Sequence, residues 1–165
     1  MDFFVVSFVG GFVGAYFMDV TEAILSRWHI RSGVTAAYIG RWAVGLGQGR
    51  FFHANIESSN PIKNEVRIGL WFHFIVGGGM VALAYPVVMT LLGFTGSSDH
   101  LFTSLIFGFA TSIFPWFILM PSLGWGLFGL KGPAGSKPVL APILSHIPYG
   151  LGIGLTLMAY YKMWN

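Results

Sequence analysis

Five ionisable side chains could do chemistry in this sequence because they lie inside or at the rim of long apolar segments. In chain order they are Asp19, Glu22, Glu65, His73 and His146. Ionisable residues in a membrane-spanning segment are costly and usually face a partner or a water-filled cavity. Imidazoles exchange protons near neutral pH, and carboxylates bind cations. The set therefore predicts a polar pocket that faces the cytoplasm within a membrane protein.

Three further polar residues belong to the predicted pocket. Ser122 follows Pro121 in the third apolar segment, whereas Arg41 and His53 fall in a long polar loop. His53 comes three residues after Arg50 and could face a lipid phosphate, the mouth of the pocket or simply solvent. The remaining loop histidines, His29 and His100, are expected to be solvated.

The composition sets the class of protein. Apolar residues make up 55% of the chain, charged residues 9%, and the mean hydropathy is +0.70. A soluble domain of 165 residues does not need so much hydrophobic surface, so an integral membrane protein is predicted. The sequence has no cysteine, which excludes disulfides, thiolate metal sites and a cysteine nucleophile. The net charge of +3 is explained by basic loops, so no nucleic-acid partner is expected.

Four apolar segments are long enough to cross a bilayer. A helix rises about 1.5 Å per residue, so about 20 residues span a hydrocarbon core of about 30 Å. The predicted spans cover about residues 3–25, 66–92, 101–130 and 138–161. We therefore expect an all-α, polytopic fold with four transmembrane helices in a single membrane domain, residues 1–165.

The first loop, residues 26–65, carries its own helical signal. Apolar residues recur in it every four positions, which places them on one face of a helix. They are Val34, Tyr38, Trp42 and Leu46. With arginines nearby, this pattern predicts a short interfacial helix at the membrane surface.

The distribution of basic residues predicts the orientation in the membrane. Lysine and arginine gather in and beside the first and third loops: Arg27, Arg31, Arg41, Arg50, Lys63, Arg67, Lys131 and Lys137. Cytoplasmic loops carry such an excess. Loops 26–65 and 131–137 are therefore expected in the cytoplasm and both termini on the other side, in an inner (plasma) membrane.

This topology places three ionisable residues at one depth. Asp19, His73 and His146 each lie about six to eight residues from the cytoplasmic end of a span. At about 1.5 Å per residue, all three fall roughly 9–12 Å below the cytoplasmic rim. We expect them to meet there, with Glu22 and Glu65 closer to the cytoplasm.

Three prolines are predicted to break the helices around this level: Pro115, Pro121 and Pro148. Each proline removes a backbone donor and leaves a carbonyl one turn earlier without its helical partner. Bare carbonyls at membrane depth are tolerated only inside protein or beside water. The third and fourth helices are therefore expected to open towards a shared cavity.

Several functions are compatible with such a layer. The polar residues could hold the bundle together through hydrogen bonds, or they could relay protons during passage of a small solute or ion, which is the preferred hypothesis. Alternatively, His73 and His146 could bind a metal ion with Asp19 or Glu65 in a membrane metalloenzyme, or hold a haem between them. The chain could also be a structural subunit of a larger membrane complex. Besides the lipid bilayer, the glycine-rich first and second spans suggest a homo-oligomer partner.

A succession of short motifs resembles a known family. They are Met18-Asp19, Gly40-Arg41-Trp42, Gly49-Arg50-Phe51 with His53, Glu65 with His73, Pro121 with Gly124 and Gly126, and His146 with Gly150-Leu-Gly152. In order and spacing they are similar to the bacterial membrane proteins of domain-of-unknown-function family 2938. The resemblance implies a four-span inner-membrane protein and brings no activity with it.

Overall fold

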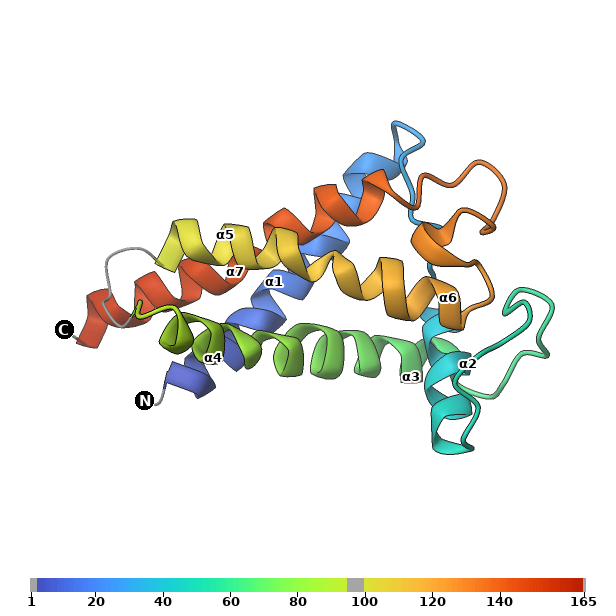
Figure 1. The fold of residues 1–165 in the computed structure, drawn as a ribbon, viewed down its shortest axis with the longest axis horizontal. Helices are drawn as coiled ribbons and strands as arrows, with labels where there is room; N and C mark the ends of the chain where they lie inside the picture. Colours follow the sequence, from blue (N-terminus) through green and yellow to red (C-terminus); the bar gives the residue numbers. More distant parts are fainter. Residues whose placement is uncertain (1–2, 95–99, 165) are drawn as a thin grey trace. The chain divides into compact units, whose positions relative to one another are not determined.

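The structure is a computed structural model that describes residues 3–94 and 100–164. Within these ranges the chain forms helices, turns and loops, and no β-strand. The helices are α1 (Phe3–Ser26), α2 (Ala36–Gly47), α3 (Glu65–Phe72), η1 (His73–Met80), α4 (Ala84–Leu91), α5 (His100–Thr111), η2 (Pro115–Leu119), α6 (Met120–Ser122), η3 (Leu127–Gly129) and α7 (Leu140–Trp164) (Figure 1).

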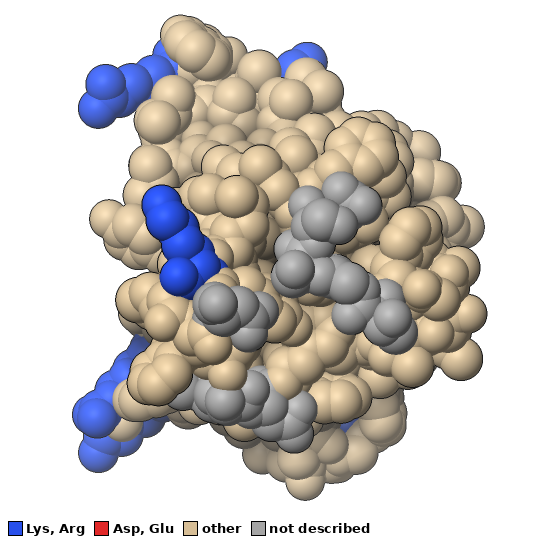
Figure 2. Space-filling model, turned by 90° about the vertical axis from the view of Figure 1, so that its left-hand side faces the viewer, with Lys and Arg blue, Asp and Glu red and all other residues tan. Residues whose placement is uncertain are grey.

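Four helical stretches are long and apolar enough to cross a membrane, which confirms the predicted all-helical membrane fold. They are Phe3–Ser26, Glu65–Leu91, His100–Ser122 and Leu140–Trp164. Figure 2 shows a face on which residues other than Lys, Arg, Asp and Glu cover most of the described surface. A lipid bilayer is the environment that such helices require.

The third span ends earlier than residue 130, where the sequence analysis placed its end. It stops at Ser122 because Gly124 and Gly126 have φ angles of 90° and 71°, which a right-handed helix does not contain. The chain then turns into the short 3₁₀ helix η3. The residues after Ser122 therefore belong to a loop, although they remain apolar.

Two of the four spans contain π-helical segments. In the second span α3 continues into η1, which has eight residues and includes the run Gly77–Gly79. In the third span Pro115 is the first residue of η2. By contrast, α7 continues through Pro148 as one helix of 25 residues, so the predicted break of the helix at Pro148 was wrong. Most π-helices are single turns, and many lie at functional sites.

The described chain divides into two compact units. Unit 1 comprises residues 3–21, 74–94, 100–111 and 144–164. Its core contains Tyr85, Tyr149, Ile153 and Leu157, each at most 1% exposed. Glycines let the helices of this unit approach closely; a Cβ on Gly14, for example, would collide with the backbone of Tyr149.

Unit 2 comprises residues 22–73 and 112–143 and has its own core. The core residues are Trp42, Ile56, Met120, Leu123 and Trp125. Helix α2 begins at the N-cap Thr35, whose hydroxyl accepts a hydrogen bond from the Tyr38 amide. The apolar stripe of α2, recognised in the sequence, packs against this core. Because each unit has a core, a single membrane domain stays a prediction.

Candidate functional site

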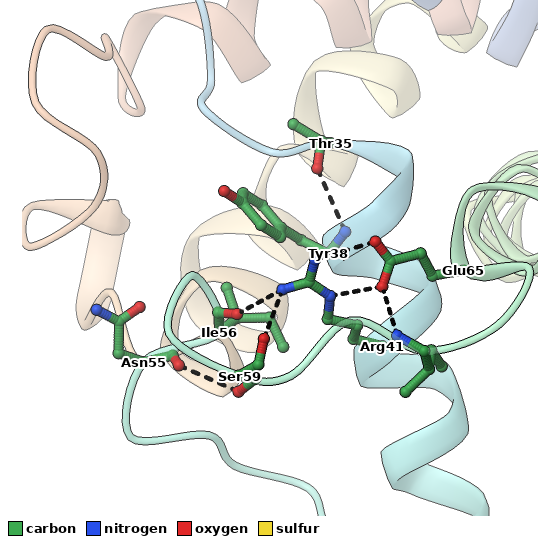
Figure 3. A network of polar contacts seen from close by, with 8 residues as sticks. Thr35, Tyr38, Arg41, Asn55, Ile56, Ser59 and Glu65 are labelled. Atoms are coloured by element: carbon green, nitrogen blue, oxygen red, sulfur yellow. Dashed lines mark hydrogen bonds and ion pairs between the residues drawn. The ribbon is translucent and has the colours of Figure 1, made fainter.

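The most connected polar side chain of unit 2 is that of Arg41, at the middle of α2 (Figure 3). Its Nε donates a hydrogen bond to Glu65 Oε2 at 2.6 Å, and its Nη2 donates to Glu65 Oε1 at 3.0 Å. Its Nη1 donates to the carbonyls of Ile56 and Ser59, at 3.2 Å and 2.9 Å. A guanidinium fork matches a carboxylate in this way, whereas an ammonium group does not.

Glu65 is held in place by the start of α3. The preceding Asn64 adopts a left-handed conformation with φ 62°, and the Ile62 amide donates to Glu65 Oε2 at 3.0 Å. The side chains of Arg41 and Glu65 are 11% and 15% exposed. The hydrogen bonds to Glu65 raise the pKa of the Arg41 guanidinium above its ordinary value. The pair is thus an ion pair that is largely shielded from solvent.

Two glycines bring α2 and α3 close enough for this pair to form. A Cβ on Gly69 would collide with the carbonyl oxygen of Ala36, and a Cβ on Gly40 would collide with that of Glu65. Contact between backbones therefore sets the crossing of the two helices. Arg41 follows Gly40 directly, so its side chain starts beside the first turn of α3.

The chemistry of this network is structural. Both carboxylate oxygens of Glu65 accept hydrogen bonds, and all three nitrogens of the Arg41 guanidinium donate. A pair whose donors and acceptors are satisfied by protein holds elements together and leaves little capacity for a ligand. We call the network of Arg41, Glu65, Ile56, Ser59 and Ile62 the Arg41 clasp.

His53 and Ser122 are also brought together in unit 2. The His53 amide donates to the Ser122 carbonyl at 2.8 Å, and the Ser122 hydroxyl donates to the Ile118 carbonyl at 2.6 Å. The His53 ring lies against Gly45 of α2, and its Nε2 is buried without a hydrogen-bond partner among the described residues. Burial lowers the pKa of His53, and the nearby Arg50 charge lowers it further.

This lowered pKa predicts a loss of stability in acid. Below about pH 6.5 an unfolded chain takes up a proton on His53 that the folded protein resists. The free energy of unfolding should therefore fall as the pH drops from about 6.5 towards the folded-state pKa, by less than about 1.4 kcal/mol per pH unit. Thermal unfolding of wild type and His53→Leu between pH 5 and 8 measures the difference.

The variant should have the shallower pH dependence, because leucine cannot be protonated. His29→Asn is the control, since His29 is exposed and has a φ of 59° that asparagine tolerates. Identical slopes in wild type and His53→Leu would contradict the assignment.

In unit 1, His146 is tied to the third span. Its Nδ1 lies 2.9 Å from Thr111 Oγ1, and the Thr111 hydroxyl donates to the Gly108 carbonyl at 2.6 Å. Because the hydroxyl proton is used on Gly108, Thr111 accepts a hydrogen bond from His146, which places an imidazole proton on Nδ1. One turn away, the Tyr149 hydroxyl donates to the Gly78 carbonyl within η1 at 2.6 Å.

The packing of α1 on α7 indicates which residues of α7 lie at the same height along the helices as Asp19. Gly10 lies against Ile153 and Gly14 against Tyr149, so the two helices run antiparallel within unit 1. One further turn puts Asp19 near the level of His146. Asp19 itself is exposed.

Glu22 and His73 belong to unit 2, where both are half-buried. The meeting of Asp19, His73 and His146 in one pocket stays a prediction. Within either unit, no three His, Asp or Glu side chains of the described residues gather closely enough to hold a metal ion. The ligand set of His73, His146, Asp19 and Glu65 is divided between the two units, so it stays a prediction, and so does haem ligation by the two histidines.

His100 is a polar centre that the sequence analysis missed. It is 4% exposed, so the expectation that it is solvated was wrong. Its Nδ1 lies 3.0 Å from the Tyr85 hydroxyl, which is also 2.6 Å from Thr103 Oγ1, and its ring stacks on Tyr161 at 5.3 Å. A usable signal existed in α5, where polar or small residues form one buried face: His100, Ser104, Gly108 and Thr111.

Comparison with known proteins agrees with the motifs. A search of curated proteins and a search of solved structures each found no match. A family model described as "Protein of unknown function (DUF2938)" matches residues 8–160. The match covers most of the chain and includes at least part of each of the four spans. The chain therefore belongs to the DUF2938 family of proteins of unknown function.

Proposed function

We propose that this multi-pass membrane protein binds or translocates a small solute or ion, and that ionisable side chains on its spans exchange protons during the process. The observation that carries the proposal is η1, the π-helix of eight residues within the second span. A π-helix is wider than an α-helix and shifts the carbonyls out of their α-helical pairing. Such backbone within a span is a recurrent feature of transport sites.

Two features of η1 support a functional role. It begins at His73, an ionisable residue within a span, and contains three consecutive glycines. It is also fixed at one carbonyl, that of Gly78, by the buried Tyr149 hydroxyl. A wide helical turn that is held by a side chain can present backbone carbonyls to a ligand that an α-helix would pair internally. The span does not have to unfold for this.

Proton exchange would fall to the imidazoles. The hydrogen bond between His146 and Thr111 fixes the orientation of one imidazole, and imidazoles in general exchange protons near neutral pH. The excess of lysine and arginine in loops 27–64 and 123–139 supports a cytoplasmic position for both loops in an inner membrane.

Binding can be tested by thermal unfolding of the purified protein with one probe at a time. We would use Na⁺, K⁺, Mg²⁺, Zn²⁺, amino acids, short carboxylates and sugars, each at 10 mM. A ligand at about 100 times its Kd stabilises the folded state by about 2.7 kcal/mol, which raises Tm by roughly 5–10 °C in a chain of this size. At least one probe should do so.

In His73→Gln the Tm without probe should stay near that of wild type, while the rise with the probe should disappear. The control His29→Asn should keep both the wild-type Tm without probe and the rise of Tm with the probe. A rise with Zn²⁺ alone would favour the metalloenzyme hypothesis instead. An unchanged Tm with every probe, or an undiminished rise in His73→Gln, would overturn the proposal.

A further inference from the structure

Unit 2 presents a strongly basic surface. All of its residues are described, and seven of its Lys and Arg side chains are exposed: Arg27, Arg31, Arg50, Lys63, Arg67, Lys131 and Lys137. Its acidic residues are Glu22, Glu57 and Glu65, of which Glu57 alone is exposed. The negative charge of Glu65 is already paired with Arg41 in the Arg41 clasp. A surface with this excess of positive charge attracts anions.

One part of this surface is apolar as well as basic. Arg50 is followed by Phe51 and Phe52, whose side chains are 61% and 71% exposed. Large aromatic side chains next to a cation are typical of residues at the boundary between lipid headgroups and acyl chains. The segment lies between the first and second spans, so it is on one side of the bilayer. It directly follows α2, which packs on the first turns of the second span, and we therefore place it beside the membrane surface.

The Arg50–His53 segment is held rigidly although it has no regular secondary structure. The Arg50 amide donates to the Gly45 carbonyl at 2.8 Å, and the Trp42 indole donates to the Phe51 carbonyl at 3.0 Å. The His53 amide is bonded to the Ser122 carbonyl at 2.8 Å. The backbone is therefore fixed at three of four residues, Arg50, Phe51 and His53, around the two exposed rings, which reduces the entropy lost on binding.

We propose that Arg50, Phe51 and Phe52 form a binding site for an anionic phospholipid of the adjacent leaflet. The guanidinium pairs with the lipid phosphate and negative headgroup, and the two rings insert at the level of the glycerol backbone. Charge complementarity selects an anionic lipid, because seven of the eight exposed charged side chains of unit 2 are basic. This site is independent of the proposed solute function, since none of its three residues lies in a span.

Native mass spectrometry of the detergent-solubilised protein tests the site directly, with dioleoylphosphatidylglycerol and dioleoylphosphatidylcholine in competition. The wild type should retain phosphatidylglycerol in preference to phosphatidylcholine. Arg50→Gln should reduce this preference about fivefold, and Arg50→Lys should retain most of it. The double variant Phe51→Ala with Phe52→Ala should weaken retention of both lipids.

The controls are Lys162→Gln and Phe102→Ala, which remove an exposed cation and an exposed ring of unit 1. Both should behave as wild type, and the Tm of every variant without added lipid shows whether it folds. Equal retention of the two lipids by the wild type would overturn the proposal. So would an effect of Arg50→Gln no larger than that of Lys162→Gln.

Discussion

Arg41→Lys is expected to destabilise the protein almost as much as Arg41→Ala, each lowering Tm in detergent by about 5–10 °C. A lysine keeps the charge but cannot donate along two parallel directions to Glu65 while also reaching the carbonyls of Ile56 and Ser59. Both variants therefore leave a shielded carboxylate and two carbonyls short of donors. Thermal unfolding monitored by circular dichroism measures the loss.

The matched control is Arg50→Lys, because Arg50 is exposed and its side chain makes no hydrogen bond among the described residues. That variant should lose less than about 1 °C. Glu65→Gln should be milder than Arg41→Ala, since the bonds from Arg41 to the two carbonyls remain possible. A wild-type Tm in Arg41→Lys would show that the Arg41 clasp does not require a guanidinium.

Gly69→Ala should be among the most destabilising single-methyl changes in the protein. The added Cβ would collide with the backbone carbonyl of Ala36, which cannot move without separating α2 from α3. Overpacking typically lowers the free energy of unfolding by about 1–3 kcal/mol. Because the collision here is with backbone, we expect a loss of at least about 3 kcal/mol. Thermal unfolding and the elution volume in size-exclusion chromatography would report the change.

Gly47→Ala provides the opposite control in the same pair of helices. A Cβ on Gly47, the last residue of α2, meets nothing within 4 Å. This substitution should be neutral or stabilise the protein by up to about 1 kcal/mol, because alanine favours the helix. If Gly69→Ala and Gly47→Ala had the same Tm, the crossing of α2 and α3 would not depend on close backbone contact.

The sequence predicted the spans well because span length and hydropathy are local properties. Three of the four predicted spans agree with the structure to within about three residues at each end. The end of the third span could not be predicted in this way. The residues after Ser122 stay apolar, and the helix stops because Gly124 and Gly126 adopt positive φ angles. Hydropathy does not report backbone conformation.

The polar contacts were harder to predict because they depend on how helices cross. Arg41 and Glu65 were both candidate residues, but their pairing across 24 positions follows from the backbone contact at Gly40 and Gly69. The burial of His100 depends on Tyr85 and Tyr161, which come from two other spans. A residue's own neighbours in the sequence do not carry that information.

Proton movement in reconstituted liposomes tests the proposed function most directly. Vesicles containing the protein and internal pyranine would receive each probe of the binding screen from outside, and the internal pH would be followed. The account predicts that at least one probe drives a pH change at least about tenfold faster than in protein-free vesicles, and that His73→Gln abolishes it while Lys162→Gln does not. Rates equal to those of protein-free vesicles for every probe would contradict it.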